Sequence, residues 1–207
     1  MPQAIKNAVS LLTSLLIVVS FSGCAARTYM EVNYHVPNAS QELSGQVVHL
    51  RVVDQRETGS ILTANAANHV QNFSGVYSLA WIMPDQHRVL AGEHHLLELF
   101  KTVFEKRLAA LGGGTTDSTR EGTPVLTIEL KQVSIDLQNR KWKVDLNYDA
   151  VLSLEGRPAA MENIHGSAER VRIMGRKGAE TVFSDIFSDI INRLDLIKLF
   201  RNARLIP

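Results

Sequence analysis

The sequence predicts an α+β fold: a two-layer domain in which two amphipathic helices pack on one face of a mixed or antiparallel β-sheet. Three observations predict it. Two segments, 93–111 and 177–197, carry apolar residues at helical spacing. Three consecutive strand patterns lie between them and form a C-terminal meander over 125–174. A β-branched run precedes the first helix. Together, these elements are expected to form one domain over residues 46–207.

The first strand is predicted at 46–53 by a nearly continuous aliphatic run that is typical of a strand buried on both faces. A polar stretch, 57–72, follows it, and loops of this length are often functional or mobile. A second short strand is predicted at 76–81, ahead of a turn at Pro84-Asp85.

The first helix is predicted at 93–111, because its apolar residues recur every three or four positions and form one stripe. Gly112-Gly113-Gly114 ends it, since glycine readily adopts the positive φ that closes a helix.

The meander contains the clearest strand, 141–154, in which apolar residues alternate strictly with polar ones, as in a sheet covered on one side. In the strand before it, 125–137, the alternation slips by one position. We therefore predict a β-bulge near Lys131-Gln132. The third strand is predicted at 162–174.

A closing helix is predicted from residue 177 or 178. Its buried stripe comprises Val182, Phe183, Ile186, Phe187, Ile190, Ile191, Leu194 and Ile197. The side chains predicted to face solvent are Asp185, Ser188, Asp189, Asn192 and Arg193.

Residues 1–23 are predicted to form an export signal, with Lys6 in a weak positive region and an apolar stretch from Ala8 to Phe21. Ser22 and Gly23 then precede Cys24 and resemble a bacterial lipobox, in which signal cleavage exposes a cysteine that carries diacylglycerol. Cys24 is the sole cysteine of the chain, so it has no disulfide partner within it. The alternative is an uncleaved signal anchor with an incidental cysteine.

Residues 24–45 are predicted to be the lipidated N-terminus and a flexible tether that reaches roughly 25 Å. Alternatively, the apolar alternation of Met30, Val32 and Tyr34 pairs this segment onto a sheet edge. Ala25 in place of Asp after the cysteine favours the outer membrane by the sorting rule of enterobacterial lipoproteins. The inner membrane is the alternative.

Charge and composition exclude several classes of protein. Lys6 is the only charged side chain in 1–23, so 21 of the 22 basic side chains remain beyond the signal, against 21 acidic ones. This balance argues against a nucleic-acid binder and against a polybasic membrane patch. An apolar content of 45% argues against a disordered chain.

Candidate chemistry is sparse, and we predict no catalytic residue, no metal site and no cofactor. His94, His95 and Glu98 share the start of the first helix, but two solvated histidines are the simpler interpretation. Asp54 and Arg56 follow the first strand, where binding groups are common, and are a possible binding pair. An ion pair that stabilises the strand exit is the simpler interpretation.

The mature chain resembles the YajG family of bacterial outer-membrane lipoproteins. The resemblance rests on Cys24, Asp54-Gln55-Arg56, Leu96-Leu97, Phe104-Glu105-Lys106, the strands 125–137 and 141–154, and Leu199-Phe200. It implies an outer-membrane lipoprotein that faces the periplasm, and only Cys24 carries over as a functional residue. The chain departs from the family at Phe21 and in the length of its first loop.

These observations favour a non-enzymatic, lipid-anchored envelope protein that binds an envelope protein partner of unknown identity and no nucleic acid. One alternative is an auxiliary or carrier lipoprotein of an envelope lipid-transport system, which would need an apolar cleft between sheet and helices. A second is a cell-wall-acting enzyme, which would need a cleft with convergent carboxylates or histidines.

Overall fold

The computed structural model describes residues 28–70, 72–118, 120, 122–171 and 177–207. Ser22, Gly23 and Cys24 lie outside these residues. The elements are β1 (Thr28–His35), β2 (Val47–Asp54), α2 (Ala64–Ala67), β3 (Phe73–Ile82), β4 (Arg88–His95), α3 (Leu96–Ala110), β5 (Gly114–Thr115), β6 (Val125–Gln138), β7 (Lys141–Leu154), β8 (Arg157–Val171), α4 (Lys177–Arg193) and α5 (Leu196–Asn202). None of the helices in the described residues is long and apolar enough to span a membrane.

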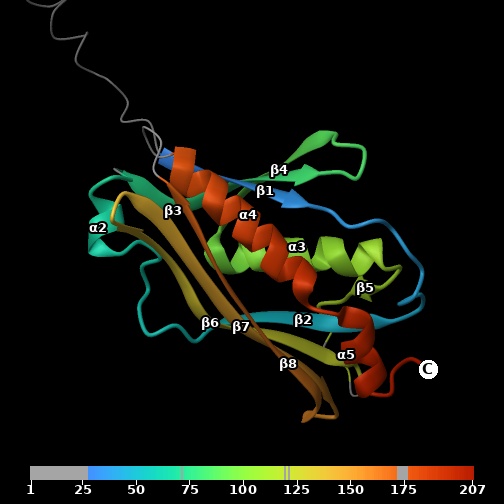
Figure 1. Ribbon diagram of the computed structural model, residues 1–207. Coiled ribbons are helices and arrows are strands. Elements are labelled where there is room, and N and C mark those ends of the chain that lie inside the picture. Colours follow the sequence, from blue (N-terminus) through green and yellow to red (C-terminus); the bar gives the residue numbers. More distant parts are fainter. Residues whose placement is uncertain (1–27, 71, 119, 121, 172–176) are drawn as a thin grey trace, which may run out of the picture.

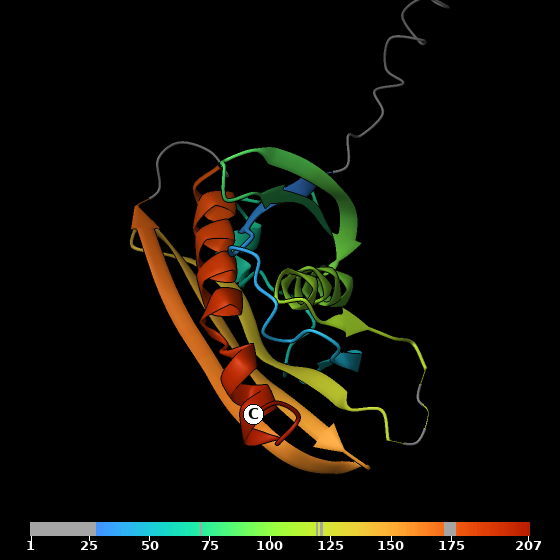
Figure 2. The ribbon, with the colours of Figure 1, turned by 90° about the vertical axis from the view of Figure 1, so that its right-hand side faces the viewer.

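The α+β class is confirmed, and the arrangement differs from the expected one in having a second sheet. The described strands form a smaller sheet of order β1-β3-β4 and a larger one of order β5-β2-β6-β7-β8. Helix α3 contacts β2 and β5 of the larger sheet and β3 and β4 of the smaller one, while α4 contacts β1, β7 and β8. Both helices therefore lie between the two sheets (Figures 1 and 2).

The meander forms as the alternation predicts. β6, β7 and β8 pair antiparallel, and the register of β6 against β7 shifts between Leu130 and Gln132, which confirms the bulge. The inward residues of β7 from Trp142 to Leu152 are at most 1% exposed. Asn139 and Arg140 join β6 to β7 with φ of 47° and 61°, which is the left-handed geometry that a tight hairpin requires.

The tether predicted over residues 24–45 is wrong from residue 28 onward, and the alternative pairing is confirmed. β1 pairs parallel with β3, and its side chains Met30, Val32 and Tyr34 are at most 1% exposed. Leu43 is also buried, and its N–H donates to the carbonyl of Leu111 at 2.9 Å. The segment is part of the fold despite its polar residues, because burial of Met30, Val32, Tyr34 and Leu43 removes their apolar surface from water and stabilises the folded state.

Two helix boundaries also differ from the expected ones. Glu93 to His95, predicted to begin the first helix, belong instead to β4, and α3 begins at Leu96. The closing helix is interrupted at Asp195, whose carboxylate accepts from the Lys198 N–H at 2.9 Å and so starts α5 as a separate helix.

β2 and the polar stretch after it are buried differently from expectation. One face of β2 is buried at Val48 and Leu50, but Val47 is 47% exposed, so the strand is not enclosed on both faces. The stretch 57–72 contains α2 and packs Ile61, Ala66 and Val70 into the core. Much of it is therefore part of the domain.

Arg107 is a buried cation at the junction of α3 and α4, with 7% exposure. Its guanidinium donates to the carbonyls of Ile191, Asn192 and Leu194, where α4 ends. Burial lowers the pKa of Arg107, and the Tyr34 and Tyr148 hydroxyls lie near enough to oppose that shift. The side chain thus satisfies the carbonyls of Ile191 and Asn192 in the last turn of α4, and it shares the Leu194 carbonyl with the Leu196 N–H.

Candidate functional site

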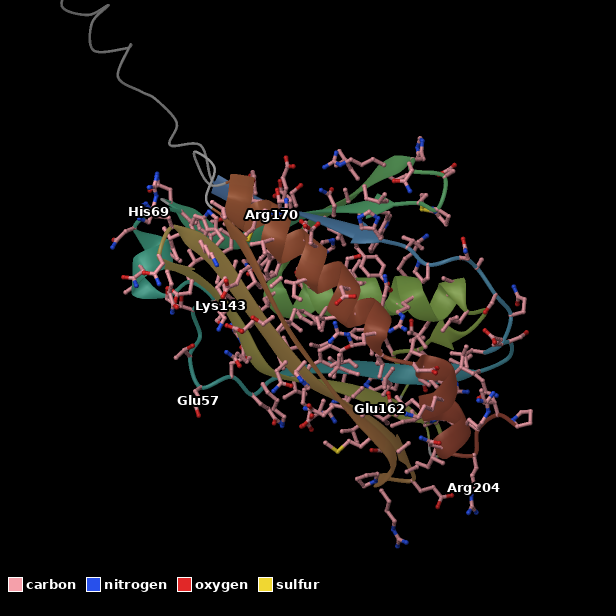
Figure 3. The ribbon with its side chains drawn as sticks, in the orientation of Figure 1. Glu57, His69, Lys143, Glu162, Arg170 and Arg204 are labelled. Carbon is pink, nitrogen blue, oxygen red and sulfur yellow. The ribbon has the colours of Figure 1, made fainter. Side chains whose placement is uncertain are left out.

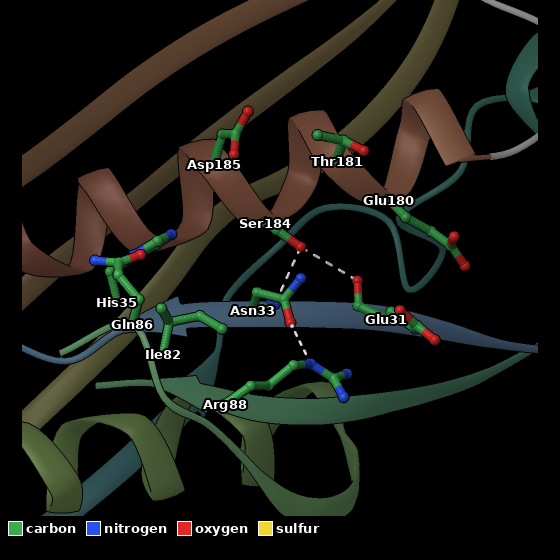
Figure 4. Close-up of a pocket in the computed structure, with 10 residues that line it drawn as sticks. All are labelled: Glu31, Asn33, His35, Ile82, Gln86, Arg88, Glu180, Thr181, Ser184 and Asp185. Atoms are coloured by element: carbon green, nitrogen blue, oxygen red, sulfur yellow. Dashed lines mark hydrogen bonds between the residues drawn. The ribbon is translucent and has the colours of Figure 1, made fainter. Parts of the chain in front are cut away.

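A groove of about 910 Å³ lies between β1, α4 and the hairpin of β3 and β4 (Figure 4). Its lining residues are Glu31, Asn33 and His35 of β1, Ile82, Gln86 and Arg88 of the hairpin, and Glu180, Thr181, Ser184 and Asp185 of α4. They are almost entirely polar or charged, so the groove suits a partner that forms hydrogen bonds.

The alternation of β1 positions one wall of the groove. Residues 30, 32 and 34 point into the core, and therefore Glu31, Asn33 and His35 point outward along the opposite face. The helical spacing of α4 brings Ser184 and Ser188 alongside, one turn apart, facing the backbone of β1.

Serines of α4 satisfy the edge of β1. The N–H of Asn33 donates to Ser184 Oγ at 3.1 Å, and that hydroxyl donates to the Glu31 carbonyl at 3.2 Å (Figure 4). The N–H of His35 donates to Ser188 Oγ at 2.8 Å. A helix thus occupies the place of a neighbouring strand, which protects the edge from pairing with another chain.

The prediction that Ser188 and Asn192 face solvent is wrong. Ser188 is 4% exposed. Asn192 donates from Nδ2 to the His35 carbonyl at 2.8 Å and accepts from the Tyr34 hydroxyl at 2.5 Å. Their face of α4 lies against β1, which was predicted to be a tether, and so a polar helix face here covers a strand edge.

Replacing Ser188 with alanine is expected to lower the free energy of unfolding by about 1 kcal/mol, because the part-buried His35 N–H would lose its acceptor. Urea denaturation monitored by circular dichroism measures the change. Ser167→Ala, at an exposed position of β8, is the matched control and should change it little. Equal effects of the two substitutions would contradict this role of Ser188.

The groove carries charges of both signs. Arg88 Nε donates to Asn33 Oδ1 at 3.3 Å, and Asp185 is paired with Arg170 at 2.8 Å. Glu31 and Glu180 add carboxylates at the end of the groove nearest the start of α4 (Figure 4). These groups can accept and donate hydrogen bonds along an extended polar segment, but they do not form a nucleophile with a base beside it.

The candidate binding pair, Asp54 and Arg56, is brought together as an ion pair. Arg56 Nη2 lies 2.7 Å from Asp54 Oδ2, and Nε donates to Asp54 Oδ1 at 2.8 Å. The Arg56 side chain is 7% exposed, and its Nη1 is buried without a hydrogen-bond partner. Two smaller hollows, of about 520 and 290 Å³, border Arg56. The contacts agree with an ion pair that holds the strand exit, and a ligand role for the pair stays a prediction.

The pair has a consequence for acid stability. Hydrogen bonds from Arg56 hold the pKa of Asp54 below its ordinary value of 3.8. A lowered folded pKa stabilises the fold at pH above the ordinary value, and this stabilisation disappears as the pH falls through the folded pKa. The free energy of unfolding should therefore fall more steeply below about pH 4 in the wild type than in Asp54→Asn. Arg56→Gln should show the same shallower fall in urea denaturation series, and slopes equal to the wild type in both variants would contradict the pairing.

The histidines at the start of α3 contact backbone groups. His94 Nε2 lies 3.0 Å from the Ala91 carbonyl, and His95 Nδ1 lies 3.3 Å from the Gly75 carbonyl. Glu98 accepts from the His95 N–H at 3.4 Å and so caps the helix. Across the described residues, no group of three or more histidine, cysteine, aspartate or glutamate side chains is placed to hold a metal ion.

Comparison with known proteins places the fold. No family model and no curated protein sequence matches the chain. Among solved structures, the chain is similar to protein XCC0632 from Xanthomonas campestris, of the family DUF330, with a TM-score of 0.55. The match covers 84% of this chain and 97% of that one at 11% identity. At this identity the likeness shows a shared α+β fold.

Proposed function

We propose that the chain is an exported lipoprotein of the YajG type, anchored to the outer membrane by acylated Cys24, whose domain binds another envelope component without catalysing a reaction. The observation that carries the proposal is the sequence Phe21-Ser22-Gly23-Cys24 after an apolar export signal. Two or three acyl chains hold a domain stably on a bilayer, at about 0.8 kcal/mol for each buried CH₂ group.

The binding role is supported by the groove beside β1. It is open and polar, it is bounded by β1, α4 and the β3–β4 hairpin, and the hydroxyl of its Ser184 already bonds backbone groups of β1. A groove with carboxylates and an arginine suits an extended polypeptide segment, whose N–H and C=O groups need partners along their length.

An auxiliary lipoprotein that carries lipid would need an apolar cleft between the larger sheet and the helices. That space is filled by aromatic rings: Phe104 and Phe100 of α3 lie 5.7 and 6.4 Å from Tyr148 of β7, and Phe100 also lies 5.1 Å from Phe187 of α4, measured between ring centroids. All four side chains are fully buried. We therefore propose a binding partner at the surface and no lipid in this layer.

The enzyme alternative is disfavoured by how its candidate groups are used. Asp54 is occupied by Arg56, and His95 and Glu98 are engaged with the backbone at the start of α3. A non-enzymatic role therefore stays our proposal.

The anchor is tested by replacing Cys24 with alanine and growing cells with an alkyne-tagged fatty acid. The wild type should incorporate the tag, and Cys24→Ala should not. Phe21→Leu, which restores the usual lipobox residue, is the matched control and should be labelled at least as well as the wild type. Labelling that persists in Cys24→Ala would overturn the proposal.

The membrane and the partner are tested in the same cells. Separation of the membranes by density should place the tagged protein in the outer membrane, and recovery with the inner membrane would contradict that assignment. A photo-crosslinking residue at Thr181, in the groove, should yield a defined envelope product that is absent when the residue replaces Ser167 on the outer face of β8. Identical products from both positions, or none from Thr181, would argue against the groove.

A further inference from the structure

The folded domain begins close to the proposed anchor. Thr28, the first residue of β1, follows Cys24 by four positions. Four residues span at most about 14 Å when fully extended. The start of β1 therefore lies within about 14 Å of a lipidated Cys24, whereas a flexible tether over residues 24–45 would reach roughly 25 Å.

β1 is fixed within the domain, so the short connection constrains the whole domain. Its inward side chains are buried, it pairs with β3 from Met30 to His35, and serines of α4 bind its free edge. Pulling β1 out to lengthen the connection would expose Met30, Val32 and Tyr34 to water, which opposes such a movement.

Several other segments lie at the same end of the domain as the start of β1 (Figure 1). Helix α4 runs in the same direction as β1, because Ser184 contacts Glu31 and Ser188 contacts His35. β8 ends at Val171, next to Arg170, which pairs with Asp185 of α4 at 2.8 Å. The stretch that contains α2 and His69 precedes Phe73, the partner of Thr28. Figure 3 shows His69 and Arg170 toward this end and Glu162 and Arg204 toward the other.

This end also suits a headgroup surface. Arg140 lies in the turn from β6 to β7, and Lys141, the first residue of β7, pairs with Val171 in the sheet and lies 3.3 Å from the carboxylate of Glu169. Val171 is 60% exposed. An anionic bilayer surface attracts basic side chains, and an exposed aliphatic side chain is stabilised by partial burial.

We infer that the end of the domain formed by the start of β1, His69, the 138–141 turn and Val171 faces the bilayer, and that α5 and the turn from β7 to β8 point away from it. The inference rests on the proposed lipidation of Cys24. The groove beside β1 then begins near the membrane at Glu31 and extends outward to Gln86, so a partner would bind alongside the anchored domain.

The experiment uses the lipidated full-length protein, in which the thioether consumes the thiol of Cys24, the sole cysteine. A single cysteine is introduced for a fluorophore by Val171→Cys or His69→Cys near the inferred membrane face, and by Arg157→Cys or Arg204→Cys at the far end. Val171 and Arg157 are the two ends of β8, and its 15 residues separate them by roughly 45 Å. Each variant is reconstituted into phosphatidylethanolamine–phosphatidylglycerol vesicles that contain lipids with a headgroup nitroxide quencher.

Fluorescence at Val171 and His69 should be quenched several-fold more strongly than at Arg157 and Arg204. Inserting 20 glycine and serine residues after Cys24 should remove most of the difference, since the tether would then reach roughly 25 Å. Equal quenching at all four positions in the protein with its native spacing, or a difference that survives the insertion, would overturn the inference. A protein that carries no lipid and does not join the vesicles would instead contradict the proposed function.

Discussion

A chain shortened to begin at Gln46 is expected not to fold. It would lose five buried apolar side chains of the N-terminal segment: Met30, Val32, Tyr34, Val36 and Leu43. At about 1.5–3 kcal/mol each, their loss removes roughly 8–15 kcal/mol, which equals the whole stability of a typical domain. It would also leave Ser184, Ser188 and Asn192 without their contacts on β1.

Circular dichroism and urea denaturation distinguish the outcomes. A chain that begins at Ala25 retains β1 and should unfold in one cooperative transition, whereas the chain from Gln46 should show no such transition. A cooperative transition of similar midpoint in both chains would mean that residues 28–45 are only a tether after all.

Replacing Arg107 with alanine is expected to lower the free energy of unfolding by about 4 kcal/mol. The guanidinium donates to carbonyls at the end of α4, and without it those of Ile191 and Asn192 would lose this donor, while that of Leu194 keeps the Leu196 N–H at 3.1 Å. The favourable interaction of a cation with a helix C-terminus is lost as well. For a domain of this size, the expected fall in Tm is roughly 10 °C.

The two control variants separate charge from hydrogen-bond geometry. Arg107→Lys keeps a cation but lacks the planar fork that reaches several carbonyls at once, so its stability should lie between wild type and Arg107→Ala. Lys101→Ala removes a cation from the exposed face of the same helix, where its partners lie 3.7–3.8 Å away, and should cost less than about 1 kcal/mol. A loss for Arg107→Ala no larger than that for Lys101→Ala would refute the role of Arg107.

Elements with strong local patterns could be predicted from the sequence. The alternation of β7 and the one-position slip in β6 are local, and both strands and the bulge are as predicted. β4 was missed because its residues are mostly exposed and carry little apolar alternation. The turn at Pro84-Asp85, followed by Val89-Leu90-Ala91, was the available signal for a returning strand.

The division into two sheets could not be predicted, because it depends on which strands pair across long distances in the chain. β1 pairs parallel with β3, more than 40 positions away, and no local pattern specifies that choice. The groove beside β1 could not be predicted for the same reason, because it also depends on elements that are far apart in the chain. Glu31, Asn33 and His35 alternate with the apolar residues of β1, and this alternation was the signal for one wall of the groove. Ser184 could be assigned to the groove only once β1 was placed beside α4.

We propose that Cys24 is the acylated N-terminus of an exported protein, and the mass of the N-terminal tryptic peptide distinguishes this state from an unprocessed chain. Trypsin cuts after Arg27, so the processed protein should release residues 24–27 with a diacylglyceryl group on the Cys24 sulfur. A peptide that still joins residues 7–23 to Cys24, or an unmodified Cys24 at the N-terminus, would contradict the claim.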